Sequence, residues 1–199
     1  MEKNYSETST YRPRDIKAFN TVSVDPYYLE NSKPAEGTIK AECVFDFLGY
    51  SGSSGRVTLI QGKDDLTSII GEDFKGLQPG LHALKIHTYG NLEDGCEGLG
   101  QVFNPFGSER GHSHEDITFR RVGDLENISA RFDTTGETKK RDMLVKLSGP
   151  NSVIGRSMAI YEREDDHDQT EHKATEGSEP RYREGEGRPI ACCVIGLKD

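Results

Sequence analysis

Short apolar runs alternate with turn residues along most of the chain. The runs are rich in β-branched and aromatic side chains and cover residues 38–45, 56–60, 81–89, 127–132, 143–147, 157–162 and 191–197. Within 81–89 the side chains fall on two faces, with His82, Leu84, Ile86 and Thr88 on one and Ala83, Lys85, His87 and Tyr89 on the other. Many short strands separated by turns, with no helical period, predict an all-β sandwich or barrel.

Three segments lack this pattern. Residues 1–36 are polar and contain three prolines, and they predict a flexible N-terminal extension in front of a domain that spans residues 37–199. Residues 90–126 are rich in glycine, and residues 163–188 are highly charged with hardly an apolar side chain. Both predict long loops, and loops of this length in a compact domain are commonly functional or disordered.

Composition and charge narrow the function. The formal net charge of −9 argues against non-specific binding to nucleic acid or to an anionic membrane. No apolar run approaches the roughly 20 residues that a membrane-spanning helix needs, and the polar N-terminus does not resemble a secretory signal. We therefore expect a cytoplasmic protein that has neither a nucleic-acid nor a membrane partner.

The chain has four cysteines, Cys43, Cys96, Cys192 and Cys193. Their spacing matches neither a zinc ribbon nor a redox pair, and in a reducing compartment they would be thiols that serve packing alone. If Cys192 and Cys193 lie on a strand, they point to opposite faces.

Several motifs together resemble the copper/zinc superoxide dismutase family. They are GLHALKIHTYGN (80–91), Gly95–Cys96, FNPF (103–106), VGDLEN (122–127), LSGPNSVIGRSMAIYE (147–162) and IACCVIG (190–196). Their order and spacing follow the family from about Thr38 to Leu197. The resemblance implies an eight-stranded Greek-key β-barrel with a metal-binding loop near 90–126 and an electrostatic loop near 163–188.

The resemblance also locates the metal-ligand positions, and most of them have changed. In the family, copper is held by four histidines, and zinc by three histidines and an aspartate, with one histidine shared. The copper positions fall at Lys85, His87, Val102 and Tyr161. The zinc positions fall at Val102, His112, Arg121 and Asp124, where His112 requires a two-residue insertion.

This donor set argues against copper chemistry. A redox-active copper must stay bound as Cu(II) and Cu(I), which one imidazole does not achieve. A lysine ammonium has no lone pair, valine has no donor, and a tyrosine phenol must first lose a proton of pKa ~10. We expect no bound copper. A rearranged zinc site from His87, His112 and Asp124, with His114 as an auxiliary ligand, stays open beside the alternative that the loop histidines are solvated.

Two of the residues at the metal-ligand positions, Lys85 and Arg121, are positively charged. Our hypothesis is that Lys85 or Arg121 pairs with Asp124 and holds the loop in place of a metal, because a buried carboxylate needs a partner. The resemblance further implies a structural hydrogen-bonding role for His82, and it places Asp165 where the family links its two metal sites. The arginine that guides superoxide falls at Pro189, next to Arg188.

For the cysteines, the resemblance implies a disulfide between Cys96 and Cys192 that ties the long loop to the last strand. Cys43 takes the place of a free buried cysteine, and Cys193 takes the place of a glycine.

We therefore predict a superoxide-dismutase-like protein that has lost copper-dependent dismutation and acts as a binding or regulatory homologue. The alternative is a divergent dismutase with residual activity through a rearranged metal site. The implied partners are a second copy in a homodimer, or an active dismutase or its copper chaperone in a heterodimer. An apolar patch of Val44, Ile154, Val194 and Leu197 would serve the contact, although Glu42 stands where the family prefers an apolar residue.

Overall fold

The computed structural model describes residues 37–46, 52–108, 120–131, 136–165 and 185–199. The chain divides into two units, Met1–Ala35 and Glu36–Asp199, and all described residues belong to the second. The predicted N-terminal extension, residues 1–36, lies outside them. Among the described residues no helix is long and apolar enough to cross a membrane.

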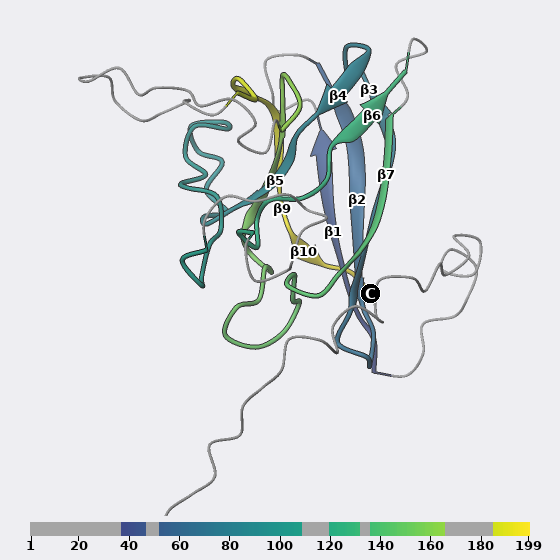
Figure 1. Cartoon of the computed structure of the whole chain (residues 1–199), viewed down its shortest axis with the longest axis vertical. Helices are drawn as coiled ribbons and strands as arrows, with labels where there is room; N and C mark the ends of the chain where they lie inside the picture. Colours follow the sequence, from purple (N-terminus) through teal and green to yellow (C-terminus); the bar gives the residue numbers. More distant parts are fainter. Residues whose placement is uncertain (1–36, 47–51, 109–119, 132–135, 166–184) are drawn as a thin grey trace, which may run out of the picture. The chain divides into compact units, whose positions relative to one another are not determined.

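All regular elements in the described part are strands (Figure 1). They are β1 (Ile39–Asp46), β2 (Ser54–Gln61), β3 (Thr67–Lys75), β4 (Gly80–His82), β5 (Leu84–His87), β6 (Ile128–Ala130), β7 (Gly136–Asp142), β8 (Ser157–Tyr161), β9 (Pro189–Val194) and β10 (Gly196–Leu197).

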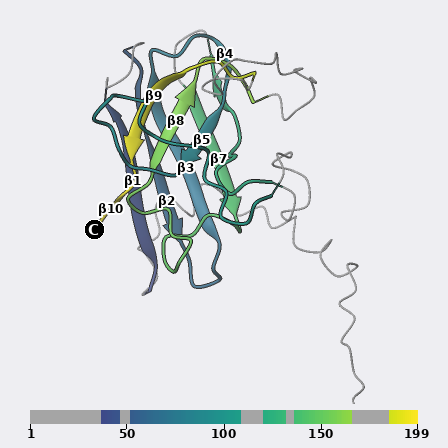
Figure 2. The same cartoon turned by 90° about the vertical axis from the view of Figure 1, so that its left-hand side faces the viewer.

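The strands form two antiparallel sheets. One has the order β10-β1-β2-β3-β7-β6-β4, and the other has the order β5-β8-β9, and Figure 2 shows them as two layers. The chain passes from one sheet to the other at Ala83, between β4 and β5, and at Ile195, between β9 and β10. If each of these pairs is counted as one bent strand, the ten strands become eight. The pairing of β3 with β7, which skips three strands, supplies the Greek-key crossover. The predicted fold class is confirmed.

The three-stranded sheet is buried on both faces. Leu84, Ile86 and Ile160 point into the main core between the sheets. Ala159 and Tyr161 point the other way, into a smaller cluster that contains Cys96, Leu99 and Cys192. The alternation predicted for residues 81–89 is confirmed, because Leu84 and Ile86 join the core while Lys85 and His87 lie on the opposite face. The long loop therefore covers a sheet face that would otherwise be exposed.

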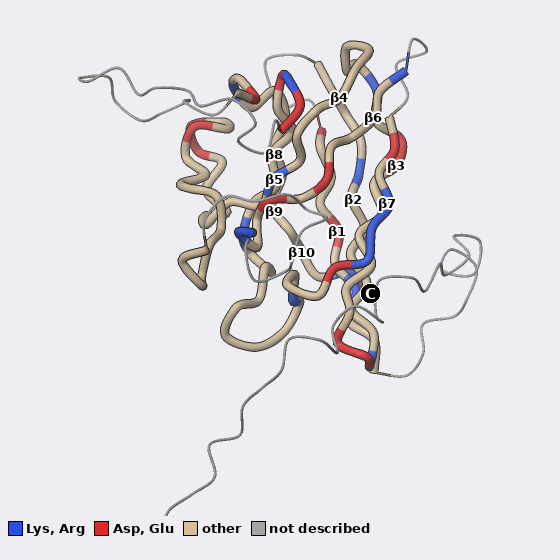
Figure 3. Tube along the Cα trace, viewed as in Figure 1, with Lys and Arg blue, Asp and Glu red and all other residues tan. Residues whose placement is uncertain are grey.

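The strand predictions failed at three places. Residues 143–147 form bends and one isolated bridge, between Lys146 and Ser152. Asp142 Oδ1 accepts hydrogen bonds from the amides of Leu144 and Val145, and Val145 packs in the core. β3 and β7 were missed. β7, GETKKRD, has no apolar face because it buries only Gly136, Thr138 and Asp142, and Figure 3 shows its basic residues as a continuous blue stretch. Pairing with β3 makes this segment a strand, in spite of its low intrinsic preference.

Candidate functional site: a buried ionic centre

The site is built on the free edge of β5, where two segments of the long loop add backbone hydrogen bonds. Ile86 donates its amide to Gly123 O at 2.9 Å and accepts from the amide of Phe103 at 2.8 Å. These bonds place Lys85 opposite Asp124 and His87 opposite Val102. Four positions that the sequence analysis singled out are thus brought together on one sheet edge.

Gly123 makes this approach possible. A Cβ atom at this position would lie 2.2 Å from Ile86 O and 2.9 Å from the Phe103 nitrogen, distances that real Cβ atoms do not reach. Backbone this close to a neighbouring strand accepts only glycine. The glycine of the VGDLEN motif therefore fixes how near Asp124 comes to Lys85.

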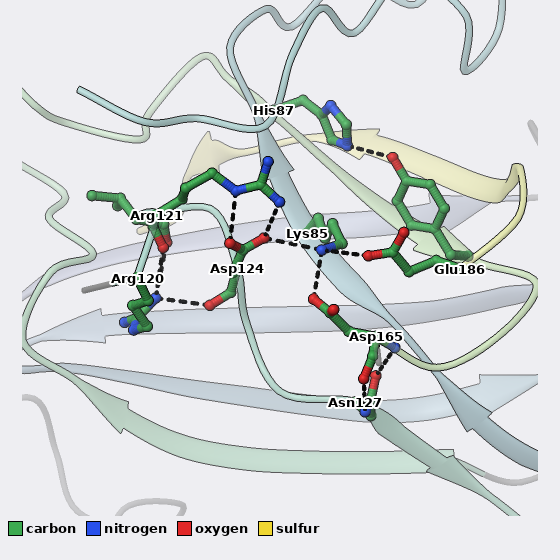
Figure 4. Close-up of polar contacts among 10 residues, drawn as sticks. Lys85, His87, Arg120, Arg121, Asp124, Asn127, Asp165 and Glu186 are labelled. Carbon is green, nitrogen blue, oxygen red and sulfur yellow. Dashed lines mark hydrogen bonds and ion pairs between the residues drawn. The ribbon is translucent and has the colours of Figure 1, made fainter. Parts of the chain in front are cut away.

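Lys85 lies at the centre of the site, surrounded by carboxylates (Figure 4). Its Nζ is 3.0 Å from Asp124 Oδ1, 2.5 Å from Asp165 Oδ2 and 2.8 Å from Glu186 Oε1, and all four side chains are about 1% exposed. Arg121 grips Asp124 from the other side, with Nε 2.8 Å from Oδ2 and Nη2 3.0 Å from Oδ1. We call Lys85, Arg121, Asp124, Asp165 and Glu186 the ionic centre. The predicted pairing of Lys85 or Arg121 with Asp124 is confirmed for both residues.

The protonation states follow from opposing effects. Burial by itself would lower the pKa of Lys85, but the charges of Asp124, Asp165 and Glu186 outweigh it and raise that pKa above its ordinary value. Burial by itself would raise the pKa of Asp124, but Lys85 and Arg121 outweigh it and lower that pKa. At neutral pH the centre therefore holds an ammonium against ionised Asp124.

Two of the carboxylates, Asp165 and Glu186, lie near the two ends of the charged segment 163–188. The Asp165 amide donates to Asn127 Oδ1 at 2.8 Å, and the Arg163 amide donates to Glu186 O at 2.9 Å. Arg188 Nε donates to Glu162 Oε1 at 2.6 Å in an exposed ion pair. Glu186 was not anticipated, because a carboxylate within a strongly charged stretch has the same sequence signal whether it is solvated or buried.

The remaining histidine of the copper positions is engaged by neighbours. His87 Nδ1 is 2.9 Å from Gly100 O, and Tyr161 Oη is 2.9 Å from His87 Nε2. A neutral imidazole that donates from Nδ1 and accepts the tyrosine proton at Nε2 satisfies both contacts. The rings are stacked with centroids 6.0 Å apart. This arrangement directs both ring nitrogens to protein atoms.

A buried arginine, which the sequence analysis missed, positions the loop. Arg120, which is 2% exposed, donates to the carbonyl oxygens of Val122 and Asp124 and to the Asp142 carboxylate. Burial lowers the pKa of nearby Lys140, and the attraction of Asp142 offsets this only in part. Nothing in the sequence distinguishes Arg120 from its neighbour Arg121. The fold around them decides which one is buried, since Arg120 is 2% exposed and the Arg121 side chain is 16% exposed.

The other expected site residues have varied outcomes. His82 is buried, and its ring nitrogens lie 2.8 Å from the carbonyl oxygens of Tyr161 and Gln78. His112 and His114 lie outside the described residues. In the part of the chain that the structure describes, no three metal-ligating side chains form a group that could hold a metal ion.

The cysteines form two disulfides. Cys96–Cys192 is confirmed. The expectation that Cys43 is a free thiol is wrong, because it is bonded to Cys193. Cys192 and Cys193 point to opposite faces of β9, as predicted, so one reaches the outer loop and the other reaches β1 through the core.

The fold and the placement of the site define an all-β barrel of the superoxide dismutase type. The profile of the family described as copper/zinc superoxide dismutase (SODC) matches residues 53–195, and the chain belongs to this family. It is 41% identical over 113 residues, 57% of this chain and 70% of the relative, to a superoxide dismutase [Cu-Zn] of Onchocerca volvulus. It is 33% identical over 162 residues, 81% of this chain and 97% of the relative, to superoxide dismutase [Cu-Zn] 2 of Mesembryanthemum crystallinum.

The family implies copper and zinc, and the residues present do not fit copper. One of the four positions is a protonated ammonium engaged by three carboxylates, and another is Val102, which has no donor atom. The third is a phenol that already shares a hydrogen bond with the fourth, the histidine. A site for Cu(II) and Cu(I) needs several imidazole or thiolate donors. This set of side chains therefore supports no catalytic step through copper.

Proposed function

We propose that this member of the family does not dismutate superoxide with copper and serves as a binding or regulatory homologue. The observation that carries the proposal is the Lys85 ammonium, which lies where a copper-ligating histidine would stand and is engaged by three buried carboxylates. An ammonium in that position repels a cation and donates no electron pair. Val102 and Tyr161 at two further positions support the same conclusion.

The proposed partner is a related barrel. Members of this family commonly form dimers, and Val44, Val194 and Leu197 are exposed on β1, β9 and β10. We propose that this face binds a second copy of the chain, with an active dismutase or its copper chaperone as the heterologous alternatives. The cytoplasmic location stays a prediction for subcellular fractionation, and the two disulfides are the observation that favours an oxidising compartment instead.

The test combines metal analysis with an activity assay. Purified protein is incubated with copper and zinc, freed of loose metal and measured for metal content and superoxide dismutation. We expect neither bound copper nor activity. The matched control is the triple variant Lys85→His, Val102→His and Tyr161→His, in which copper content should rise.

The outcomes separate the alternatives. About one copper per chain together with activity in the unaltered protein would establish the divergent dismutase. Zinc without copper would support a structural zinc site at His87, His112, His114 and Asp124, and it would leave the absence of redox chemistry intact.

A further inference from the structure

Three segments that are distant in sequence meet at one ammonium group. Asp124 belongs to the loop beside β5, Asp165 follows β8, and Glu186 precedes β9. Residues 166–185 lie between the last two. Lys85 Nζ therefore joins Asp165 and Glu186, near the two ends of the charged segment 163–188, to Asp124 of the other long loop and to β5.

The contacts use the full capacity of the ammonium. An ammonium has three N–H donors, and Lys85 has three carboxylate oxygens within 3.0 Å, each from a different residue. Asp124 is also held by Arg121, and Asp165 by Asn127. The lysine thus connects three chain segments through three separate ion pairs.

Without a central cation this arrangement would be unfavourable. Asp124, Asp165 and Glu186 are all buried at 3% exposure or less. Burying a carboxylate is costly unless a charge compensates for it. If the Lys85 charge were removed, three carboxylates would face each other without the cation they share, although Arg121 would still bind Asp124. The three chain segments would move apart, or their carboxylates would become protonated or bind another cation.

We propose that Lys85 is a tethered cation, whose ammonium performs the structural role of a bound metal and holds the described ends of both long loops against β5. The inference goes beyond the proposed function, because it concerns how the loops are held rather than whether copper chemistry occurs. It makes this attachment independent of metal supply. Lys85, at a position where the family has a metal ligand, is then the residue on which the arrangement of the site depends.

Chemical rescue tests the proposal. Lys85→Ala removes the atoms of a propylammonium ion and leaves three carboxylates around the space. In metal-free buffer with chelator, the melting temperature of this variant should fall by about 10 °C, and propylammonium chloride should restore part of the loss. Neither 1-propanol nor sodium chloride at the same concentration should do so. Lys139→Met, at an exposed position on β7, should leave the melting temperature unchanged.

Each result decides the proposal. Equal rescue by 1-propanol would show that Lys85 fills volume rather than supplying charge, and this would overturn it. A Lys85→Ala protein as stable as the unaltered chain would overturn it as well.

The unaltered protein provides a test that does not depend on the variant folding. Hydrogen exchange is followed at the amides of Arg163, Asp165 and Gly123, each of which donates a hydrogen bond at the base of a loop. We expect the same protection in chelator and in added zinc. Protection that needs zinc would overturn the tethered cation, even in a protein without dismutase activity, so the two proposals fail separately.

Discussion

At the scale of single residues, Lys85 and Arg121 differ in how they serve Asp124. Arg121 binds both carboxylate oxygens from the exposed side, with its own side chain 16% exposed. Lys85 is 1% exposed and binds Oδ1 from within. A planar guanidinium suits the two-point contact, whereas the compact ammonium suits a site with three separate acceptors. Exchanging the two residue types would satisfy neither geometry.

The pH dependence of stability follows from these two groups. The pKa of Asp124 is lowered from 3.8. Its contribution to the free energy of unfolding is therefore complete above pH 3.8 and is lost as the pH falls through the folded pKa. The pKa of Lys85 is raised from 10.5, so its contribution is complete below that value and is lost as the pH rises through the folded pKa. Between about pH 5 and pH 9 the pair should contribute a constant amount.

We therefore predict that Asp124→Asn lowers the free energy of unfolding by about 3 kcal/mol between these limits. The difference from the unaltered protein should shrink below about pH 4, because the carboxylate is then protonated in unfolded chains. Urea unfolding at a series of pH values measures it. A difference that grows on acidification would contradict the assignment of Asp124 as the ionised partner.

At the scale of elements, β5 is completed by the loop rather than by another strand. Its free edge bonds to Phe103 and Gly123 through the backbone of Ile86. The carbonyl oxygen of Leu84 accepts from the Leu125 amide in the same way. The long loop therefore behaves as part of the sheet, and its attachment depends on close backbone contact.

Gly123→Ala should weaken this attachment. The added Cβ would overlap Ile86 O and Phe103 N, so we expect a loss of about 1–3 kcal/mol in the free energy of unfolding. Gly196→Ala is the matched control, because its Cβ would meet nothing closer than Glu42 O at 4.0 Å. If both variants unfold alike in urea, the close approach at Gly123 does not limit stability.

The second disulfide gives another prediction for the elements. Cys43–Cys193 joins β1 of one sheet to β9 of the other across 150 residues of sequence. The double variant Cys43→Ala and Cys193→Ala should lose about 2–4 kcal/mol in the free energy of unfolding, because the unfolded chain gains freedom. Alkylation without reductant, followed by mass spectrometry, should find four protected cysteines in the unaltered protein. Alkylation of Cys43 and Cys193 would show that this bond does not form.

At the scale of the whole molecule, the face formed by β1 and β10 is suited to association. Val44 is 50% exposed and Leu197 70% exposed. Glu42, an acidic residue on β1, has its charge balanced by Lys198 at 2.6 Å and Arg56 at 3.6 Å. Pairing within the chain reduces the cost of covering Glu42 with a partner. The unfavourable effect expected from its sequence position is therefore smaller than the sequence alone indicates.

Sedimentation velocity tests this face. If it binds a second copy, the chain should sediment as a dimer at micromolar concentration, and Leu197→Glu should raise the dissociation constant at least tenfold by placing an unpaired charge in the contact. Leu81→Glu is the control, since Leu81 is 43% exposed on β4, away from β1 in the sheet order. A monomer at all concentrations would direct the search to the heterologous partners.

Local information was sufficient for most strands and for the general position of the site. The runs that became β1, β2, β5, β8 and β9 have apolar residues at every second position or throughout, and this pattern survives in any barrel that buries them. Lys85, His87, Val102 and Asp124 could be placed together because the spacing of several motifs identified the family. β7 could not be predicted, because its charged side chains are held in a strand by its neighbours rather than by its own preference.

By itself, the sequence determined the all-β class, the family and the loss of histidines at Lys85, Val102 and Tyr161, since these depend on residue types and their order. Only the tertiary structure decided that Glu186 joins Lys85, that Arg120 rather than Arg121 is buried, and that Cys43 finds Cys193. Each of these is a meeting of residues far apart in the chain, or a choice between two faces of one segment. Long-range distances and side-chain orientation arise from how the sheets close, and no local pattern contains them.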